Sequence, residues 1–137
     1  MGFLIDTNLW IAIERGQISA ADIHSFTGPS PVYLSSVNIA EICHGVELMT
    51  NTAQRRRAIE MLRRLRRKPL LRITGETAEI FGAISARLSK TGRGHDFRVQ
   101  DVWIASQAIQ RGFTLLTANE KDFRDIPHLK LLAVKLA

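Results

Sequence analysis

The pattern of apolar and polar positions predicts strands and helices that alternate along the whole chain. Short, continuously apolar runs are typical of strands in a parallel sheet that is covered on both faces. Residues 3–5 form such a run, and the further segments 32–34, 70–73, 113–117 and 129–134, which are rich in apolar residues, are also predicted strands. Helical spacing or helix-capping residues are found between them, over about 8–15, 20–26, 36–49, 53–67, 77–88 and 101–110. This alternation predicts an α/β fold with a mainly parallel sheet.

Capping and breaking residues set the expected ends of these helices. Asn8 can cap the first helix, and Gly16 can end it. Either Ser35 or Ser36 can cap the helix that reaches about Met49. In open α/β sheets the functional site lies beyond the carboxyl ends of the strands. Asp6, the Ser35–Ser36 pair and Asn119 each follow a predicted strand, so we expect the site near them.

The helix over 37–49 is apolar on two sides, and this predicts that it is largely buried. One face carries Val37, Glu41, His44 and Leu48, and the opposite face carries Ile39, Ile42, Cys43 and Val46. Glu41 is therefore expected in or near the interior. The alternative is an ordinary surface pair between Glu41 and His44 at i,i+3 spacing.

Asp101 is predicted in the first turn of its helix, where the helix dipole favours a carboxylate. A simple capping role would explain it. However, Asp101 shares a helix face with the apolar stripe of Ile104, Ala105, Ala108 and Ile109. This spacing predicts that its side chain faces the protein interior.

Asp6 closes the apolar run Phe3-Leu4-Ile5, where Asp-Thr-Asn would also suit a turn. A carboxylate among apolar neighbours is costly unless something pairs with it. Asp6, Glu41 and Asp101 are far apart in sequence, and a shared divalent metal ion is the simplest common partner. We therefore predict a site built from hard oxygen ligands.

Composition narrows the class of protein. The 137 residues are enough for one compact domain, and 45% hydrophobic content is normal for a globular core. Cys43 is the only cysteine, and no apolar stretch approaches the ~20 residues that span a bilayer, so a cytoplasmic protein without membrane contact is expected. The net charge of +6 favours polyanionic partners such as nucleic acid.

Four segments, in this order and spacing, carry a family resemblance. They are Ile5-Asp6-Thr7, residues 36–41 (SVNIAE), residues 101–105 (DVWIA) and residues 115–123 (LLTANEKDF). Together they resemble the PIN-domain family, and specifically its VapC-type toxin ribonucleases of type II toxin–antitoxin pairs. The resemblance covers nearly the whole chain and implies a single PIN domain over residues 1–137. The implied fold is a three-layer α/β/α sandwich around a mainly parallel sheet of about five strands.

The resemblance also implies the site. Asp6, Glu41 and Asp101 would hold Mg²⁺ or Mn²⁺, and the fourth catalytic position corresponds to Asn119, which brings an oxygen but no charge. Asp122 is the alternative for that position. Further accessory candidates are Thr7, Ser36, Thr117 and Asp96. A metal held by carboxylates can activate a water molecule and neutralise charge on a phosphodiester, so no histidine base is needed.

The activity implied is a metal-dependent endoribonuclease toxin that cleaves structured tRNA or rRNA and leaves 5′-phosphate and 3′-hydroxyl ends. The partners implied are RNA and a VapB-like antitoxin that blocks the acidic site with its C-terminal segment. A homodimer and a larger complex with antitoxin and operator DNA are also implied. Two other readings stay open: a binding module with a decayed site, hinted at by Asn119, and a PIN nuclease of RNA processing or DNA.

Basic residues gather on and beside the helix over 53–67, where Ala58, Ile59, Leu62 and Leu65 form the apolar face. They include Arg63, Arg64, Arg66 and Arg67, which we single out as an RNA-binding surface. Many like charges repel one another, and a phosphate backbone would relieve that repulsion. The alternative is an ordinary solvated face.

Overall fold

A five-stranded parallel sheet forms the centre of the protein, as seen in a computed structural model that describes residues 1–92 and 99–136. The strands are β1 (Phe3–Ile5), β2 (Val32–Ser35), β3 (Leu70–Leu71), β4 (Thr114–Thr117) and β5 (Lys130–Ala133). They lie in the order β3-β2-β1-β4-β5, and every neighbouring pair is parallel. The predicted α/β class and the number of strands are confirmed.

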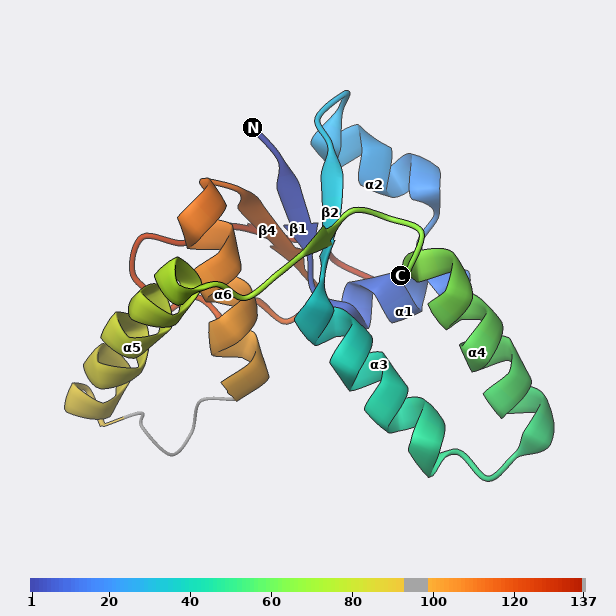
Figure 1. Cartoon of the computed structure of the whole chain (residues 1–137). Coiled ribbons are helices and arrows are strands. Elements are labelled where there is room, and N and C mark those ends of the chain that lie inside the picture. Colours follow the sequence, from blue (N-terminus) through green and yellow to red (C-terminus); the bar gives the residue numbers. More distant parts are fainter. Residues whose placement is uncertain (93–98, 137) are drawn as a thin grey trace.

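Helices connect the strands and cover both faces of the sheet (Figure 1). They are α1 (Thr7–Glu14), α2 (Ala20–Thr27), α3 (Ser36–Leu48), α4 (Thr52–Leu65), α5 (Gly75–Lys90) and α6 (Val99–Arg111), with a short 3₁₀ helix, η1 (Glu120–Asp122). In Figure 1, α5 and α6 lie on one side of the sheet and α1–α4 on the other. The three-layer α/β/α sandwich is therefore confirmed.

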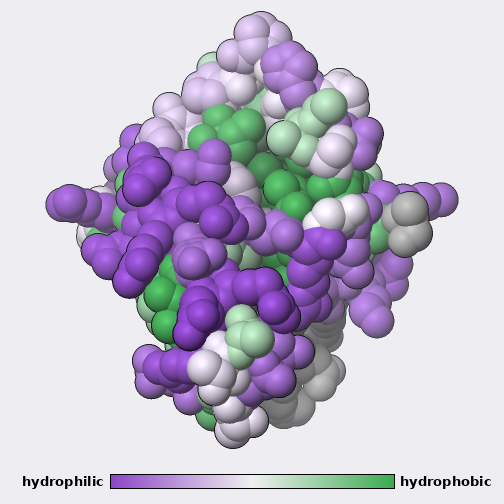
Figure 2. Space-filling view, turned by 90° about the vertical axis from the view of Figure 1, so that its right-hand side faces the viewer, coloured by the Kyte–Doolittle hydropathy of each residue, from purple (hydrophilic) through white to green (hydrophobic). Residues whose placement is uncertain are grey.

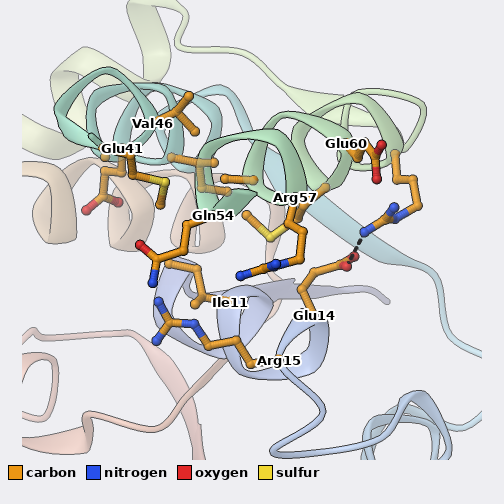
Figure 3. Close-up of a pocket in the computed structure, with 14 residues that line it drawn as sticks. Ile11, Glu14, Arg15, Glu41, Val46, Gln54, Arg57 and Glu60 are labelled. Carbon is orange, nitrogen blue, oxygen red and sulfur yellow. Dashed lines mark hydrogen bonds and ion pairs between the residues drawn. The ribbon is translucent and has the colours of Figure 1, made fainter. Parts of the chain in front are cut away.

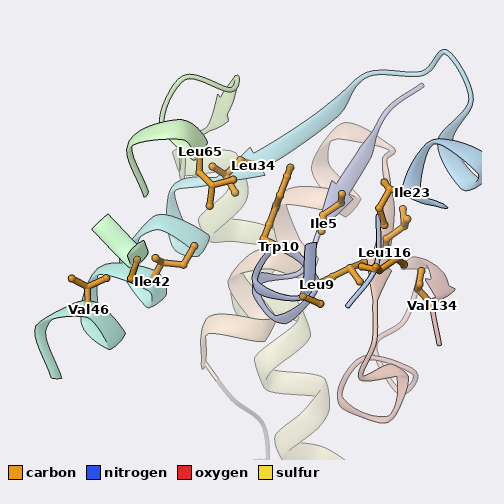
Figure 4. Packing of buried hydrophobic residues seen from close by; sticks show 13 residues of the cluster. Ile5, Leu9, Trp10, Ile23, Leu34, Ile42, Val46, Leu65, Leu116 and Val134 are labelled. Atoms are coloured by element: carbon orange, nitrogen blue, oxygen red, sulfur yellow. The ribbon is translucent and has the colours of Figure 1, made fainter. Parts of the chain in front are cut away.

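Consecutive strand residues supply the two halves of the core, because side chains in a strand alternate between its faces. Ile5 and Leu116 pack with Leu9 and Trp10 of α1 in the cluster on the α1–α4 side (Figure 4). Leu4 and Leu115 belong to the opposite cluster, with residues of α5 and α6. β1 and β4 thus contribute to the core on both faces of the sheet, as the continuous apolar run of β1 predicts.

Local capping explains where two helices begin. Asp6, in an extended conformation, is the N-cap of α1, and its side chain accepts a hydrogen bond from the backbone N–H of Thr7. The prediction that Asn8 caps this helix is wrong, because Asp6 directly follows the strand and is the N-cap, so that the helix already begins at Thr7. Ser35 caps α3. Gly16 follows the end of α1 with a φ of 74°, a conformation that glycine adopts easily.

The prediction that α3 is largely buried is wrong, although both of its apolar sides contribute residues to the core. Its buried residues are Val37, Asn38, Ile42 and Val46. Ile39 and Cys43 are half-buried, whereas Leu48 is 69% exposed. Val37 packs in the cluster with α5 and α6, whereas Ile42 and Val46 pack in the cluster on the α1–α4 side, so each apolar side of the helix is covered in part. Within the described ranges, no helix is long and apolar enough to cross a membrane.

Candidate active site

The reversal of strand order places the site beside β1. The chain runs outward from β1 through β2 to β3, then returns to β4 on the other side of β1. Ligands in open α/β sheets bind in the crevice at such a reversal, outside the carboxyl ends of the strands. Asp6 follows β1 there, and Thr117 is the last residue of β4. The backbone N–H of Asp6 donates to the carbonyl of Leu116 at 2.9 Å, which joins the two strand ends.

Both carboxylate oxygens of Asp6 accept hydrogen bonds. The backbone N–H of Thr7 donates to Oδ1 at 2.8 Å, and the hydroxyl of Thr117 donates to Oδ2 at 2.9 Å. Asp6 is 4% exposed and lies at the N-terminus of α1, where the helix dipole favours negative charge. These contacts stabilise a buried carboxylate in one orientation, and its oxygens keep further lone pairs.

Glu41 is linked to Asp6 through Thr7. The Thr7 hydroxyl donates to Oε1 of Glu41 at 2.7 Å, and the residue whose backbone binds Asp6 therefore also binds Glu41. Glu41 is half-buried on α3, which begins directly after β2. Glu41 was predicted in or near the interior. It lies at the rim of the core, where it contacts Thr7.

Asp101 lies in the first turn of α6 and is 3% exposed. Ile104, Ala105 and Ala108, on the same helix face, are fully buried. The prediction that Asp101 faces inward is confirmed. Figure 1 shows that α6 begins at the end of the molecule where β1 and β2 lead into α1 and α3. The three acidic residues therefore occupy the same end of the sheet.

Two buried amides, which the sequence interpretation did not single out, hold the surrounding elements in place. Gln107 of α6 accepts a hydrogen bond from the Ser35 hydroxyl and donates to the carbonyl of Leu71 at 3.2 Å. It therefore ties the helix that carries Asp101 to the ends of β2 and β3. Asn38 of α3 binds both Ser35 and Thr7. Polar residues at buried helix positions were the signal that could have identified both.

The remaining candidates lie in different surroundings. Asn119 is half-buried after β4, and its backbone N–H donates to the Thr117 hydroxyl at 3.0 Å. Ser36 is the half-buried first residue of α3, and Asp122 is half-buried in η1. Asp96 lies outside the described residues. Hydrogen bonds therefore bring together Asp6, Thr7, Glu41, Thr117 and Asn119.

The chemistry of these side chains suits a hard divalent cation. Three carboxylates lie at one end of the sheet, two of them almost fully buried, and carboxylate oxygens are the ligands that Mg²⁺ and Mn²⁺ prefer. Within residues 1–92 and 99–136, no three acidic, histidine or cysteine side chains form a ready-made metal cluster. Mg²⁺ is usually held by one or two carboxylates and several waters, so the donor set fits such an ion.

A groove of about 610 Å³ leads away from Glu41 between α1, α3 and α4. Figure 3 shows Glu41 near one end and Glu14 near the other. The apolar lining consists of Ile11, Ile42, Val46, Met49, Ala58 and Met61. The charged lining consists of Glu14, Arg15, Glu41, Arg57, Glu60 and Arg64. The groove can accept an elongated ligand with apolar groups and groups of either charge.

The predicted RNA-binding arginines lie at the end of α4 and just beyond it, and all four are exposed. Hydrophilic side chains cover much of the face that carries α4 (Figure 2). Arg64 differs from the others because its Nη2 lies 2.5 Å from Oε2 of Glu14. The hydrogen bond and the charge of Glu14 raise the pKa of the Arg64 guanidinium. Arg64 therefore joins α4 to α1. Arg63, Arg66 and Arg67 are the exposed residues that stay candidates for the predicted RNA-binding surface.

A parallel three-layer sandwich with buried carboxylates at its strand-order reversal defines a class of α/β proteins with an acidic site. Comparisons with known proteins identify the family. Residues 3–129 match the PIN domain. The chain is 30% identical to Ribonuclease VapC1 of Rickettsia felis, over 98% of this chain and 97% of that protein. It is 29% identical to Ribonuclease VapC of Rickettsia bellii, over 99% and 98% of the two chains. The chain therefore belongs to the PIN domain family and, within it, to the VapC ribonucleases.

Solved structures agree with this assignment. The chain superposes on VapBC-1 of nontypeable Haemophilus influenzae with a TM-score of 0.81 and 25% identity, over 97% of this chain and 98% of that one. VapBC2 of Rickettsia felis, bound to a DNA fragment from its promoter, gives a TM-score of 0.81 at 22% identity, over 98% and 100% of the chains. The likeness to VapBC2, at 22% identity, shows that the two chains share a fold.

Proposed function

We propose that this chain is a metal-dependent endoribonuclease toxin, formed by a single PIN domain over residues 1–137 and acting in the cytoplasm. The observation that carries the proposal is the placement of Asp6, Glu41 and Asp101 at one end of the sheet, with Asp6 and Asp101 almost fully buried. Carboxylate oxygens gathered at one end of a sheet are the ligands that a hard divalent cation such as Mg²⁺ or Mn²⁺ prefers.

Asp6, Glu41 and Asp101 would hold Mg²⁺ or Mn²⁺, and the amide oxygen of Asn119 would assist. When bound, such an ion lowers the pKa of a coordinated water and neutralises charge on a phosphodiester. The protein contributes rigidity, because ligands held by hydrogen bonds need little rearrangement during the reaction. Thr117 and the Thr7 backbone orient Asp6, and the Thr7 hydroxyl orients Glu41.

The substrate follows from the charge and from the family. We propose cleavage of structured tRNA or rRNA that leaves 5′-phosphate and 3′-hydroxyl ends. The net charge of +6 favours a polyanion, although the site itself is acidic. The exposed residues Arg63, Arg66 and Arg67 are proposed to contact phosphates, because they project into solvent at the end of α4.

The proposed partner is a VapB-like antitoxin. Related proteins from Rickettsia felis and Haemophilus influenzae have been solved as VapBC assemblies, the former bound to promoter DNA. The groove beside Glu41 supports an elongated partner, since its apolar lining suits apolar side chains and its three acidic and three basic residues can pair with charged ones. From the family resemblance, the active protein is also proposed to be a homodimer that joins antitoxin and operator DNA in a larger complex.

The test is cleavage of purified RNA by the purified protein. Incubation with Mg²⁺ or Mn²⁺ should release fragments with 5′-phosphate and 3′-hydroxyl ends, and EDTA should stop the reaction. Sequencing of RNA ends after brief induction in cells would identify the target. Cleavage that persists in EDTA would refute the metal requirement, and RNA binding without cleavage would favour a binding module with a decayed site.

A further inference from the structure

Asn38 is a fully buried polar residue at the centre of the candidate site, and neither the sequence motifs nor the family comparison assigns it a role. Its two polar atoms bind two different elements. The backbone N–H of Ser35 donates to Oδ1 at 2.8 Å, and Nδ2 donates to the Thr7 hydroxyl at 2.7 Å. Asn38 thus bridges the start of α3 and the start of α1.

The direction of every hydrogen bond around Asn38 follows from one backbone group. A backbone N–H can only donate, so the Asn38 atom that faces Ser35 is the carbonyl oxygen. The other arm is therefore the NH₂ group, which can only donate, and the Thr7 oxygen accepts from it. The single Thr7 proton is then left for Glu41, whose Oε1 lies 2.7 Å away.

Capping of α3 does not by itself need an asparagine. Helix α5 has the same kind of capping box, in which Thr77 accepts the backbone N–H of Thr74 at 3.0 Å. Threonine at that position satisfies the cap with one hydroxyl. Capping of α3 therefore does not require the NH₂ group of Asn38, which donates to the Thr7 hydroxyl instead.

We propose that Asn38 is a positioning residue that directs the Thr7 hydroxyl proton towards Glu41 and so orients the Glu41 carboxylate for its role in the site. This inference rests on the proposed function of Glu41 as a metal ligand. Residues that orient metal ligands through hydrogen bonds affect metal affinity or activity by about 10–100-fold. The hydrogen bonds from Asn38 to Thr7 and from Thr7 to Glu41, called the relay below, would orient a proposed metal ligand in this way.

Three variants separate orientation from packing. Asn38→Asp keeps an oxygen for the Ser35 N–H but replaces the NH₂ donor with an acceptor, which competes with Glu41 for the Thr7 proton. Thr7→Val keeps the shape of the side chain and removes the hydroxyl. Thr7→Ser, the matched control, keeps the hydroxyl. Urea unfolding in EDTA checks that each variant is folded.

The kinetic test is a double-mutant cycle on RNA cleavage. Thr7→Val and Asn38→Asp should each lower kcat by about 10–100-fold with little change in KM, and Thr7→Ser should stay near wild type. In the Asn38→Asp background, Thr7→Val should lower kcat by a much smaller factor than in wild type, because the Thr7 hydroxyl proton already points away from Glu41. Additive effects would overturn the proposal.

A second measurement needs neither metal nor activity. The side-chain NH₂ signals of Asn38, identified by their loss in Asn38→Asp, are recorded by ¹H–¹⁵N NMR in EDTA. Thr7→Val should shift the signal of the proton that donates to Thr7, whereas Thr7→Ser should leave it nearly unchanged. An Asn38 signal that is insensitive to Thr7→Val would overturn the relay. A wild-type protein that does not cleave RNA would refute the proposed function, while the NMR result still decides the relay.

Discussion

The acidic end of the sheet and the basic end of α4 are two strongly charged regions that are built in opposite ways. Asp6 and Asp101 are at most 4% exposed, and Asp6 accepts hydrogen bonds on both oxygens. Arg63, Arg66 and Arg67 are exposed at the end of a helix. Buried charges are orientated by many neighbours, whereas exposed charges remain adaptable and hydrated. Under the proposed function, the difference suits one region for chemistry and the other for contact with an RNA backbone.

The sharpest test of this contrast removes one buried charge. Asp6→Asn keeps the capping geometry but lowers the negative charge of the site, and RNA cleavage should fall by about a thousandfold, since metal stabilisation of the transition state amounts to several kcal/mol. Single-turnover cleavage measures the loss. Asp101→Asn should behave alike, and the exposed Glu79→Gln is the matched control. Metal-dependent cleavage retained by Asp6→Asn would disprove its assignment.

The packing beneath the acidic residues can be tested independently of activity. Leu116 is fully buried beside Asp6, and Leu116→Ala should lower the free energy of unfolding by about 2–5 kcal/mol through lost burial and a residual cavity. Urea unfolding in EDTA measures the change. Leu48→Ala is the control, because Leu48 is 69% exposed and its truncation should change stability by less than about 0.5 kcal/mol. Equal losses for the two variants would contradict the described core.

The basic region is tested through the salt dependence of RNA binding. Replacement of Arg63, Arg66 and Arg67 by serine should weaken binding and reduce the slope of log K against log salt by about 2, at about 0.7 per phosphate contact on single strands. Fluorescence anisotropy in EDTA measures binding without cleavage. A matched triple variant replaces Arg72, Arg87 and Arg111, which are exposed elsewhere. An unchanged slope in the first variant would assign these arginines to an ordinary solvated face.

The smallest effect is expected for the ion pair between Glu14 of α1 and Arg64 of α4. Glu14→Gln breaks the ion pair with Arg64, whose side chain is 54% exposed, and should lower stability by about 0.2–1 kcal/mol, towards the lower end because water screens the pair. Urea unfolding in low salt and in 1 M salt measures it, and the difference from wild type should shrink in high salt. A loss that is insensitive to salt would point to packing of the Glu14 side chain.

Local sequence pattern predicted much of this architecture. The strand over 3–5 and the amphipathic helix over 53–67 are found close to their predicted bounds, because apolar periodicity records which face is buried. Asp101 was predicted to face inward from its spacing to Ile104 and Ala105, and it does. The burial of α3 was overestimated, because two apolar stripes on a helix do not reveal how much of each stripe the neighbouring elements cover.

The sequence by itself determined the alternation of elements, the family, and the acidic residues of the candidate site, since these depend on short-range periodicity and local motifs. Only the tertiary structure decided that Asp6 caps α1, that Thr117 binds Asp6 across 111 positions, and that Asn38 reaches Thr7 and through it Glu41. Hydrogen bonds between distant residues depend on strand order and helix placement. Their direction and partners therefore become fixed when β1, β4 and α3 come together at one end of the sheet.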